Sequence, residues 1–373
     1  MCVTFVAFCT LYTPQPLLPL LANEFSVSPG DAGLLMTVTL LPLGIAPVVY
    51  GYFLQAIPAR LMLWVALSLL MLNQFAFYLV DEFWQLIALR ATQGLLLPAI
   101  FTALMTYCAS MAPKGQIRKT MGWYIAATIL GGFSGRLISG YFASSFSWQT
   151  AFVVPGFMLI MAIILLRYAS TDAKISFDRL NSQTISRVLS DANLRYIYLA
   201  IFSLFFVYAG ILNVLPFRLQ EVDGSITPLQ ISSLYIGYLI GIPVAIFSLR
   251  IINFLGGDKR GLLCGLLLNA VGLIAYLITD FALLYFVMFA FSAGFFFIHS
   301  TLSGLVNHLA VEHKGVVNGL YVSIYYISGA LGSWLPVYLY GWLGWGSLII
   351  VFVVVLGVAA WLMMQLRLGA CRT

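Results

Sequence analysis

Long uninterrupted apolar runs constrain this chain more than any other feature of its sequence. Two examples are Leu61–Val80 and Leu348–Leu366, each about the length that crosses a bilayer as a helix. Charged residues make up 8% of the chain and hydrophobic residues 62%, which is too apolar for a water-soluble fold. Strands of a membrane barrel would appear as short alternating segments instead. The sequence therefore predicts an all-α membrane protein.

Twelve transmembrane segments can be marked along the chain. They are predicted at 2–22, 31–54, 62–80, 84–110, 121–142, 149–167, 195–217, 229–250, 261–279, 281–306, 316–340 and 346–366. One connection is long and polar. It divides the chain into a predicted N-terminal six-helix bundle at 1–168, a cytoplasmic linker at 169–193 and a C-terminal six-helix bundle at 194–373.

The basic residues predict the orientation of these helices. With the N-terminus inside, all Lys and Arg residues fall in or beside inner loops except Arg90, Arg136 and Arg218. Positive charge accumulates on the cytoplasmic side of membrane proteins. We therefore expect a multi-pass membrane protein with both termini in the cytoplasm. The chain starts inside an apolar run, so we expect no cleaved signal peptide.

The two halves of the sequence resemble each other weakly. A shift of 197 positions brings Gly122 onto Gly319, Tyr124 onto Tyr321, Gly132 onto Gly329 and Gly135 onto Gly332. Such a repeat predicts two pseudo-symmetric bundles with a substrate site between them near the middle of the membrane.

Several motifs resemble those of the major facilitator superfamily. Residues Arg90, Gln93 and Gly94 match its R-x-x-Q-G motif, and the stretch from Gly122 to Gly140 is similar to its antiporter motif G-x8-G-x3-G-P-x2-G-G. That stretch has Arg136 in place of Pro and Ser139 in place of Gly. The loop from Gly51 to Arg60 looks like the family's G-x-L-x-D-R-x-G-R-K loop, with Gln55 where an acid is expected.

A narrower likeness is to the bacterial 12-helix drug- and sugar-efflux branch of that family. It covers nearly the whole chain and includes Tyr12–Pro19, Ser134–Gly140 and Ala293–Ser300. The resemblance implies the major facilitator fold and a location in the bacterial inner (plasma) membrane. The antiporter motif implies export against protons.

Two arginines inside predicted helices are candidates for substrate binding. A buried Arg in a membrane costs about 2.5–3.5 kcal/mol on insertion scales, so Arg90 and Arg136 are expected to face a wet cavity or polar partners. No acid lies in the predicted membrane core. Arg binds carboxylates in a bidentate manner, so an anionic cargo is one hypothesis. The alternative is that carbonyls, Gln93, Gln15 or tyrosine hydroxyls satisfy both cations.

Aromatic and amide side chains complete the candidate binding site. Tyr321 and Tyr325 share a face of the segment 316–340 and could line a cavity for an aromatic cargo, or simply pack against other helices. Gln15 and Tyr12 lie where Pro14 and Pro16 break the first helix. Inside a membrane, the carbonyls that such a break exposes are tolerated only beside protein or a cavity. Gln15 and Tyr12 therefore either contact the ligand or belong to a simple helix kink without ligand contact.

His299 is the candidate for proton coupling. It is the one residue within a predicted helix core that titrates near neutral pH. The alternative is a histidine fixed by neighbouring hydroxyls, with Ser300 and Ser303 nearby.

A set of small residues is predicted to serve packing and conformational change rather than ligand contact. Gly131, Gly135 and Ser139 are spaced so that a neighbouring helix can approach closely. The same role is expected, through the resemblance, for Gly122, Gly140, Gly51 and Arg60.

The sequence thus predicts a secondary transporter that exports a drug, sugar or organic anion by alternating access, with proton antiport. Alternatives are an uptake symporter on the same fold and a non-transporting sensor or lipid-handling protein. There is no phosphate-binding loop and no metal-ligand spacing, so we expect no enzyme activity, cofactor, metal or nucleic-acid partner. The expected partners are the cargo, protons and lipids, and the expected state is a monomer.

Overall fold

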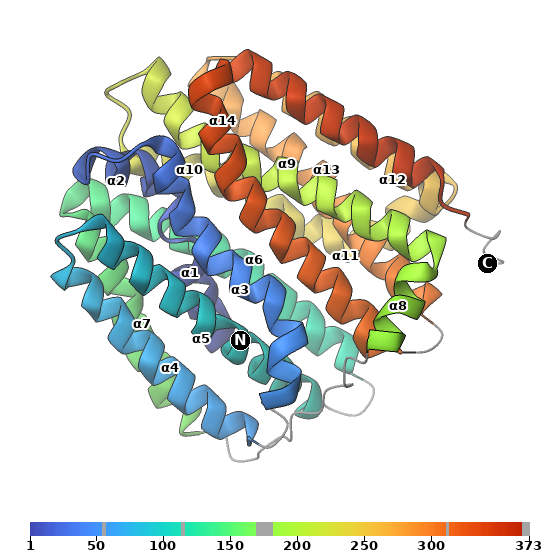
Figure 1. The fold of residues 1–373 in the computed structure, drawn as a ribbon, viewed down its shortest axis with the longest axis horizontal. Coiled ribbons are helices and arrows are strands. Elements are labelled where there is room, and N and C mark those ends of the chain that lie inside the picture. The colour runs from blue at the N-terminus through green and yellow to red at the C-terminus, as the bar shows by residue number, and fades with distance from the viewer. Residues whose placement is uncertain (54–56, 113–115, 169–181, 311–312, 368–373) are drawn as a thin grey trace.

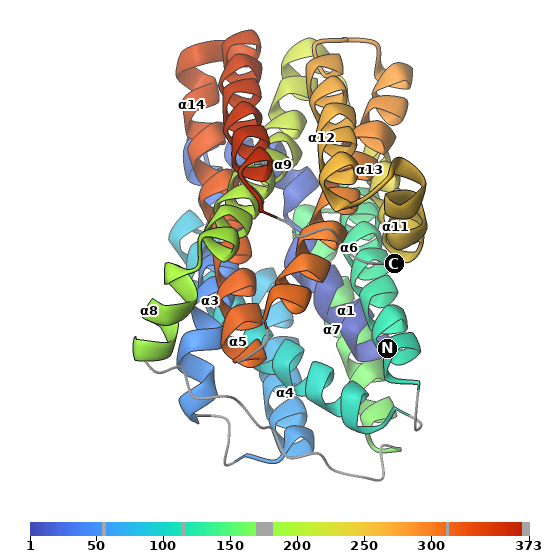
Figure 2. The same ribbon diagram turned by 90° about the vertical axis from the view of Figure 1, so that its right-hand side faces the viewer.

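The computed structural model describes residues 1–53, 57–112, 116–168, 182–310 and 313–367, and in these ranges the regular structure is helical throughout. Figures 1 and 2 show two groups of long helices lying side by side, with the early (blue to green) part of the chain in one group and the late (yellow to red) part in the other. The expectation of an all-helical bundle is confirmed.

The N-terminal half contains six passes. The first is broken into α1 (Cys2–Tyr12), a 3-10 turn η1 (Gln15–Leu17) and α2 (Leu18–Glu24). The others are α3 (Pro29–Phe53), α4 (Ala59–Ala76) continued by η2 (Phe77–Leu79), α5 (Phe83–Ser110), α6 (Ile117–Ser145) and α7 (Trp148–Leu166).

The C-terminal half also contains six passes. They are α9 (Ala192–Val222), the broken pass α10 (Pro228–Leu234), η3 (Tyr235–Ile240) and α11 (Gly241–Leu255), then α12 (Asp258–Ala275), α13 (Phe281–Leu309) and α14 (Lys314–Met364). Helix α14 holds two passes that meet at Gly344, where φ is 70° and ψ is 173°. The predicted linker contains a short helix, α8 (Ser182–Ser190), which the sequence analysis did not foresee.

Nine of the described helical segments are long and apolar enough to cross a membrane by themselves. Helices α6 and α12 are not among them, because glycine, serine and charged residues dilute their apolar character. With these two, and with α14 counted as two passes, the described residues make the twelve passes that the sequence predicted.

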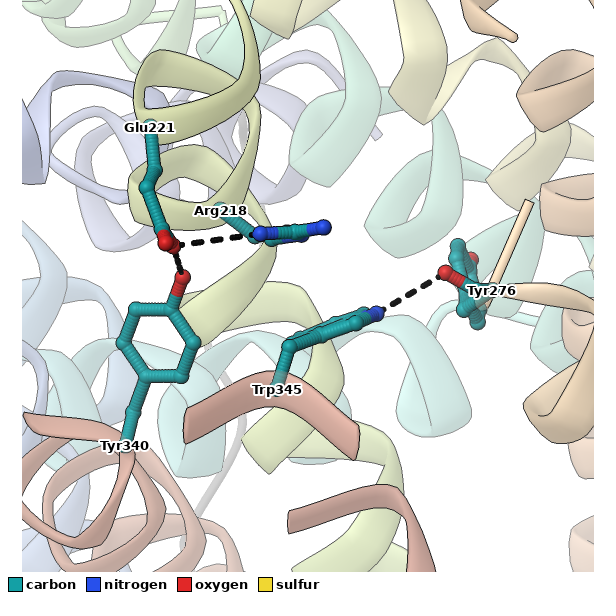
Figure 3. Close-up of polar contacts among 5 residues, drawn as sticks. All are labelled: Arg218, Glu221, Tyr276, Tyr340 and Trp345. Carbon is teal, nitrogen blue, oxygen red and sulfur yellow. Dashed lines mark hydrogen bonds and ion pairs between the residues drawn. The ribbon is translucent and has the colours of Figure 1, made fainter. Parts of the chain in front are cut away.

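The break at Gly344 is held by polar contacts to neighbouring helices (Figure 3). Tyr340 donates a hydrogen bond to Glu221 at the end of α9, and Glu221 also pairs with Arg218 at 3.3 Å. Trp345 Nε1 donates to the carbonyl of Tyr276, the C-cap of α12, at 3.0 Å. Glycine is required at the turn because a positive φ strains other residues.

The helix ends define two faces of the bundle. We call one the acidic face, after Asp31, Asp81, Glu82, Glu221 and Asp280, which lie at or beside helix ends there. The opposite, basic face carries Arg60, Arg167, Arg195, Lys259 and Arg367 at or beside helix ends. On that face Arg60 donates to the Arg167 carbonyl at 3.4 Å, and Lys259 donates to the Met364 carbonyl at 2.7 Å.

The internal repeat appears in space as well as in sequence. A Cβ on Gly135 of α6 would lie 2.6 Å from Cys9 Cα on α1, and a Cβ on Gly332 of α14 would lie 3.0 Å from Phe206 Cα on α9. Gly332 and Phe206 are each 197 positions after their counterparts (332 minus 135, and 206 minus 9). The same close helix contact is therefore built once in each half.

The two halves meet on the acidic side along what we call the seam, made by α3 with α14 and by α6 with α10. Thr37 donates to the Ala330 carbonyl at 2.8 Å, and Ser144 Oγ accepts from the Leu229 amide at 3.0 Å. A Cβ on Gly140 would lie 2.6 Å from the Pro228 carbonyl oxygen. Small residues thus let the halves close tightly on this side.

The glycines of the antiporter-like motif do not all share one environment. A Cβ on Gly131 would meet the backbone of Phe5, whereas Gly122 has nothing within 4 Å of that position. Ser139 is fully buried and donates to the Arg136 carbonyl of its own helix at 2.8 Å. Gly51 falls in the part of α3 whose side-chain surroundings are not described, and Gln55 itself lies outside the described residues.

We predict that Gly135→Ala destabilises the protein, because the added methyl group overlaps Cys9 on α1. Overpacking of this kind costs about 1–3 kcal/mol. The matched control is Gly122→Ala, where the space is open and helix propensity favours Ala. Thermal unfolding of the purified variants checks this. Equal unfolding midpoints for the two variants would contradict the assigned α1–α6 contact.

Candidate functional site: a central cavity beside two buried arginines

Pro14 creates the acceptors that hold Arg90. Because proline has no amide hydrogen, the carbonyl of Thr10 loses its usual helical donor four residues later. Arg90 of α5 takes this role. Its Nη1 donates to the Thr10 carbonyl at 3.2 Å and its Nη2 to the Leu11 carbonyl at 3.0 Å. The kink predicted in the first helix is therefore filled by a side chain of the fourth pass.

The remaining donors of Arg90 are also occupied. Its Nε donates to the Leu35 carbonyl of α3 at 3.0 Å, and its Nη1 also donates to Gln93. Hydrogen bonds to a charged group contribute about 1.5–3 kcal/mol each. The stabilisation from the three hydrogen bonds to carbonyls therefore exceeds the cost of about 2.5–3.5 kcal/mol for inserting an arginine into the membrane. The side chain is fully buried.

Gly94 explains how Arg90 reaches α3. A Cβ on Gly94 would lie 2.7 Å from the Val38 carbonyl oxygen and 2.9 Å from Thr39 Cα, so only glycine permits this approach. Thr39 in turn donates to the Arg90 carbonyl at 3.0 Å. The R-x-x-Q-G motif thus joins α5 to α1 and α3. A substrate contact for Arg90 and Gln93 stays a prediction, and this geometry favours the structural alternative.

Arg136 of α6 is also fully buried, but its surroundings differ. Its Nε donates to Gln15 Oε1 at 2.6 Å and its Nη1 to the Gly132 carbonyl at 2.8 Å. The guanidinium carbon lies 4.1 Å from the ring centre of Tyr12 and 4.9 Å from the ring centres of both Tyr235 and Tyr238. Tyrosine faces attract such a cation. Within the described residues no carboxylate pairs with it.

A cavity of about 560 Å³ lies between the halves. It occupies the part of the bundle nearer the basic face, since its wall includes Met105 and Ser303 near the ends of α5 and α13 and Ile125 near the start of α6. Tyr12 and Tyr238, which cover Arg136, are also part of its wall. The seam closes the other side.

Tyrosines and hydroxyl groups dominate the polar part of this wall. Tyr321 and Tyr325, predicted from the sequence, both line the cavity, and so does His299. None of the lining residues in the described part of the chain is Asp, Glu, Lys or Arg. Arg90, Gln93, Gln15 and Arg136 lie outside this wall, so the structure does not bring the predicted polar residues into one cluster.

His299 lies within the aromatic part of the wall. Tyr321 OH lies 3.0 Å from His299 Nδ1, and the ring of Tyr325 lies 4.9 Å from the imidazole. The hydroxyl partner is thus Tyr321 from α14, not the nearby Ser300 or Ser303.

Sequence reasoning missed three cavity tyrosines. Tyr124 of α6, Tyr238 of η3 and Tyr326 of α14 all line the cavity. The internal repeat contained a signal for the first, because Tyr124 is the counterpart of Tyr321 at the shift of 197 (321 minus 124). No comparable pattern marks Tyr238.

We predict that Arg90→Lys lowers stability strongly. A single ammonium group cannot reach the carbonyls of Thr10, Leu11 and Leu35 together, so buried acceptors lose partners at about 1–3 kcal/mol each. Thermal unfolding and the yield of monodisperse protein are the measurements. Arg195→Lys on the exposed start of α9 is the control and should behave like the parent. A stable Arg90→Lys protein would contradict this assignment.

Comparisons with known proteins agree with this architecture. The family model described as "Major Facilitator Superfamily" matches residues 1–333. The inner membrane transport protein YnfM of Escherichia coli is 26% identical over 93% of this chain and 85% of its own length. The uncharacterized MFS-type transporter YybF of Bacillus subtilis is 24% identical over 96% of this chain and 90% of its own length.

Solved structures show the same fold. A bacterial homolog of the human lysosomal transporter Spinster, in an inward-facing and unoccupied conformation, has a TM-score of 0.78 at 12% identity and covers 99% of this chain and 97% of its own. The xylose transporter XylE of E. coli, in a partially occluded inward open conformation, has a TM-score of 0.74 at 16% identity and covers 100% and 98%. The chain belongs to the major facilitator superfamily of membrane transporters.

Proposed function

We propose that the protein exports a small amphipathic molecule from the cytoplasm across the inner membrane by alternating access, in exchange for protons. The observation that carries this proposal is the cavity between the halves, which the seam closes toward the acidic face. If the basic face is cytoplasmic, as the distribution of Lys and Arg favours, this arrangement is an inward-facing state.

The cavity wall supports a particular class of cargo. Its volume of about 560 Å³ suits a drug-sized molecule or a small glycoside. Aromatic faces and hydroxyl groups without formal charge favour a cargo with a ring system and a few polar groups. Neither arginine lines the wall, so a free organic anion is not the cargo that this cavity favours in the present state.

The seam supplies the second requirement of alternating access, which is a closure that can open. Its contacts rest on small residues and a few neutral hydrogen bonds, such as Thr37 with Ala330 and Ser144 with Leu229. Neutral hydrogen bonds contribute about 0.5–1.5 kcal/mol each, so the halves can part and close without a large penalty. Rigid-body rocking of the halves would then expose the cavity to the other face.

Proton exchange requires a group that changes its charge within the cavity. Among the described residues of the wall, His299 is the imidazole, the side-chain type that can gain or lose a proton most readily in the physiological range. Tyr321 OH lies within hydrogen-bond distance of Nδ1, and a doubly protonated imidazole can only donate at that nitrogen, so protonation is linked to the arrangement of α13 against α14. The antiporter-like motif on α6 supports export as the direction.

Transport into inside-out vesicles tests the direction of coupling. The probe is the neutral aromatic glycoside or dye that raises the unfolding midpoint of the purified protein most, since a bound ligand stabilises by mass action. We expect the probe to accumulate when the vesicle lumen is acidic. Accumulation under the opposite gradient would indicate an uptake symporter instead. If neither gradient drives accumulation, the export proposal fails in favour of a sensor or lipid-handling role.

We predict that His299→Gln flattens the pH dependence of this transport, because glutamine keeps hydrogen-bonding groups but cannot change its charge. His308→Gln is the matched control. His308 is exposed in the last turn of the same helix and away from the cavity wall, so its variant should keep the parent profile. A parent-like pH profile in the His299→Gln protein would refute the assigned proton role.

A further inference from the structure

Arg136 is held by groups from both halves of the protein. Gln15, Gly132 and Tyr12 belong to the N-terminal half, whereas Tyr235 and Tyr238 belong to η3 of the C-terminal half. Two of the three tyrosine faces that surround the guanidinium group therefore reach it across the interface.

Arg90 provides an internal comparison. Its hydrogen-bond partners, which include the carbonyls of Thr10, Leu11 and Leu35, all lie in the N-terminal half. A movement of one half against the other leaves these bonds intact. The same movement removes Tyr235 and Tyr238 from Arg136, so only one of the two buried cations changes its surroundings.

The position of Arg136 in the repeat leaves it without a charged counterpart. At the shift of 197 positions, the counterpart of Arg136 in the C-terminal half is Ser333 (333 minus 136). Ser333 is uncharged and accepts a hydrogen bond from Asn213 at 3.0 Å. A small cavity of about 10 Å³ is lined by Arg136, Ser333 and Asn213. That volume is about the size of one water molecule. Asn213 Oδ1 is buried without a hydrogen-bond partner there.

We propose that Arg136 becomes an anion-binding site when the seam opens. This inference rests on the alternating access proposed above. As α6 and η3 part, the small cavity widens toward the acidic face and the guanidinium group loses two tyrosine faces. A buried arginine without a carboxylate partner then requires a new counter-charge. A small anion from the solution on the acidic face, chloride or a simple carboxylate, supplies it and stabilises the open state.

The geometry of the guanidinium group suits this ligand. Nε and Nη1 are engaged by Gln15 and Gly132, which fix the plane of the group within the N-terminal half. Its other donors point away from these partners, as the fork of five N–H groups requires. Arginine offers such a fork to carboxylates and other anions more effectively than lysine does.

Cysteine labelling at the seam tests the proposal. Ser232 of α10 is fully buried and lies against Gly140, so a Ser232→Cys thiol reacts with a bulky maleimide only when the seam opens. The protein is placed in nanodiscs at constant ionic strength with chloride, formate or the bulky morpholinoethanesulfonate anion, and labelling of the parent protein is subtracted. A ligand of the open state at four times its Kd raises the open population, and hence the labelling rate, about five-fold.

The variants of this experiment separate the anion site from general effects of salt. Arg136→Gln in the Ser232→Cys background should label at the same rate in all three anions. Tyr238→Leu uncovers the guanidinium group in the closed state too, so the anion effect should shrink, because a ligand with equal affinity for both states shifts no population. Tyr238→Phe keeps the ring over the cation and loses only the contact of its hydroxyl with Arg136, so most of the effect should remain. The Tyr238 pair remains decisive if Arg136→Gln does not fold.

The possible outcomes distinguish the anion site from the export proposal. Faster labelling in chloride or formate, lost with Arg136→Gln, supports the anion site, and the stronger of the two ions tells whether inorganic anions or carboxylates are preferred. Equal labelling in all three anions, with labelling that still responds to pH, overturns the anion site and leaves the export proposal standing. A Ser232→Cys thiol that never reacts in any condition overturns both.

Discussion

The hydrogen bonds of Arg90 are the constraint on which the N-terminal half depends. A guanidinium group in the membrane must donate to acceptors that helices normally keep for themselves. Here Pro14 frees the Thr10 carbonyl, and Gly94 lets α5 approach α3 closely enough to reach the Leu35 carbonyl. The break in the first helix and the cation that fills it are therefore one feature. This feature joins α1, α3 and α5 without any contribution from a cargo.

The same break also positions the second arginine. Gln15 lies in the 3-10 turn that follows Pro14 and accepts a hydrogen bond from Arg136. The break in the first helix thus supplies hydrogen-bond acceptors to both buried arginines. Arg90 is bonded within one half and stabilises it, while Arg136 lies where the halves meet and is covered by tyrosines from each. The different roles proposed for the two arginines follow from which half supplies their partners.

The cavity and the seam follow from this arrangement. Close packing of α1 against α6 at Gly135, and of α9 against α14 at Gly332, holds the helices of each half together as one unit. The space left between the units on the basic side is lined by tyrosines from both, including the repeat-related Tyr124 and Tyr321. A neutral, aromatic wall of this kind is the basis for the proposed selection of cargo by shape and stacking, and His299 is the residue proposed to make transport sensitive to pH.

The sequence by itself determined the solvent, the fold and the repeat. Apolar runs require lipid, and the R-x-x-Q-G and antiporter-like motifs resemble one superfamily, whose fold is confirmed. It also singled out Arg90, Arg136, His299 and Tyr321 as residues of consequence. Only the tertiary structure decided what each one touches, because a helix sequence gives the depth of a side chain and not the partner across the interface. That is why the two arginines looked alike in sequence, although one bonds carbonyls and the other lies among tyrosines.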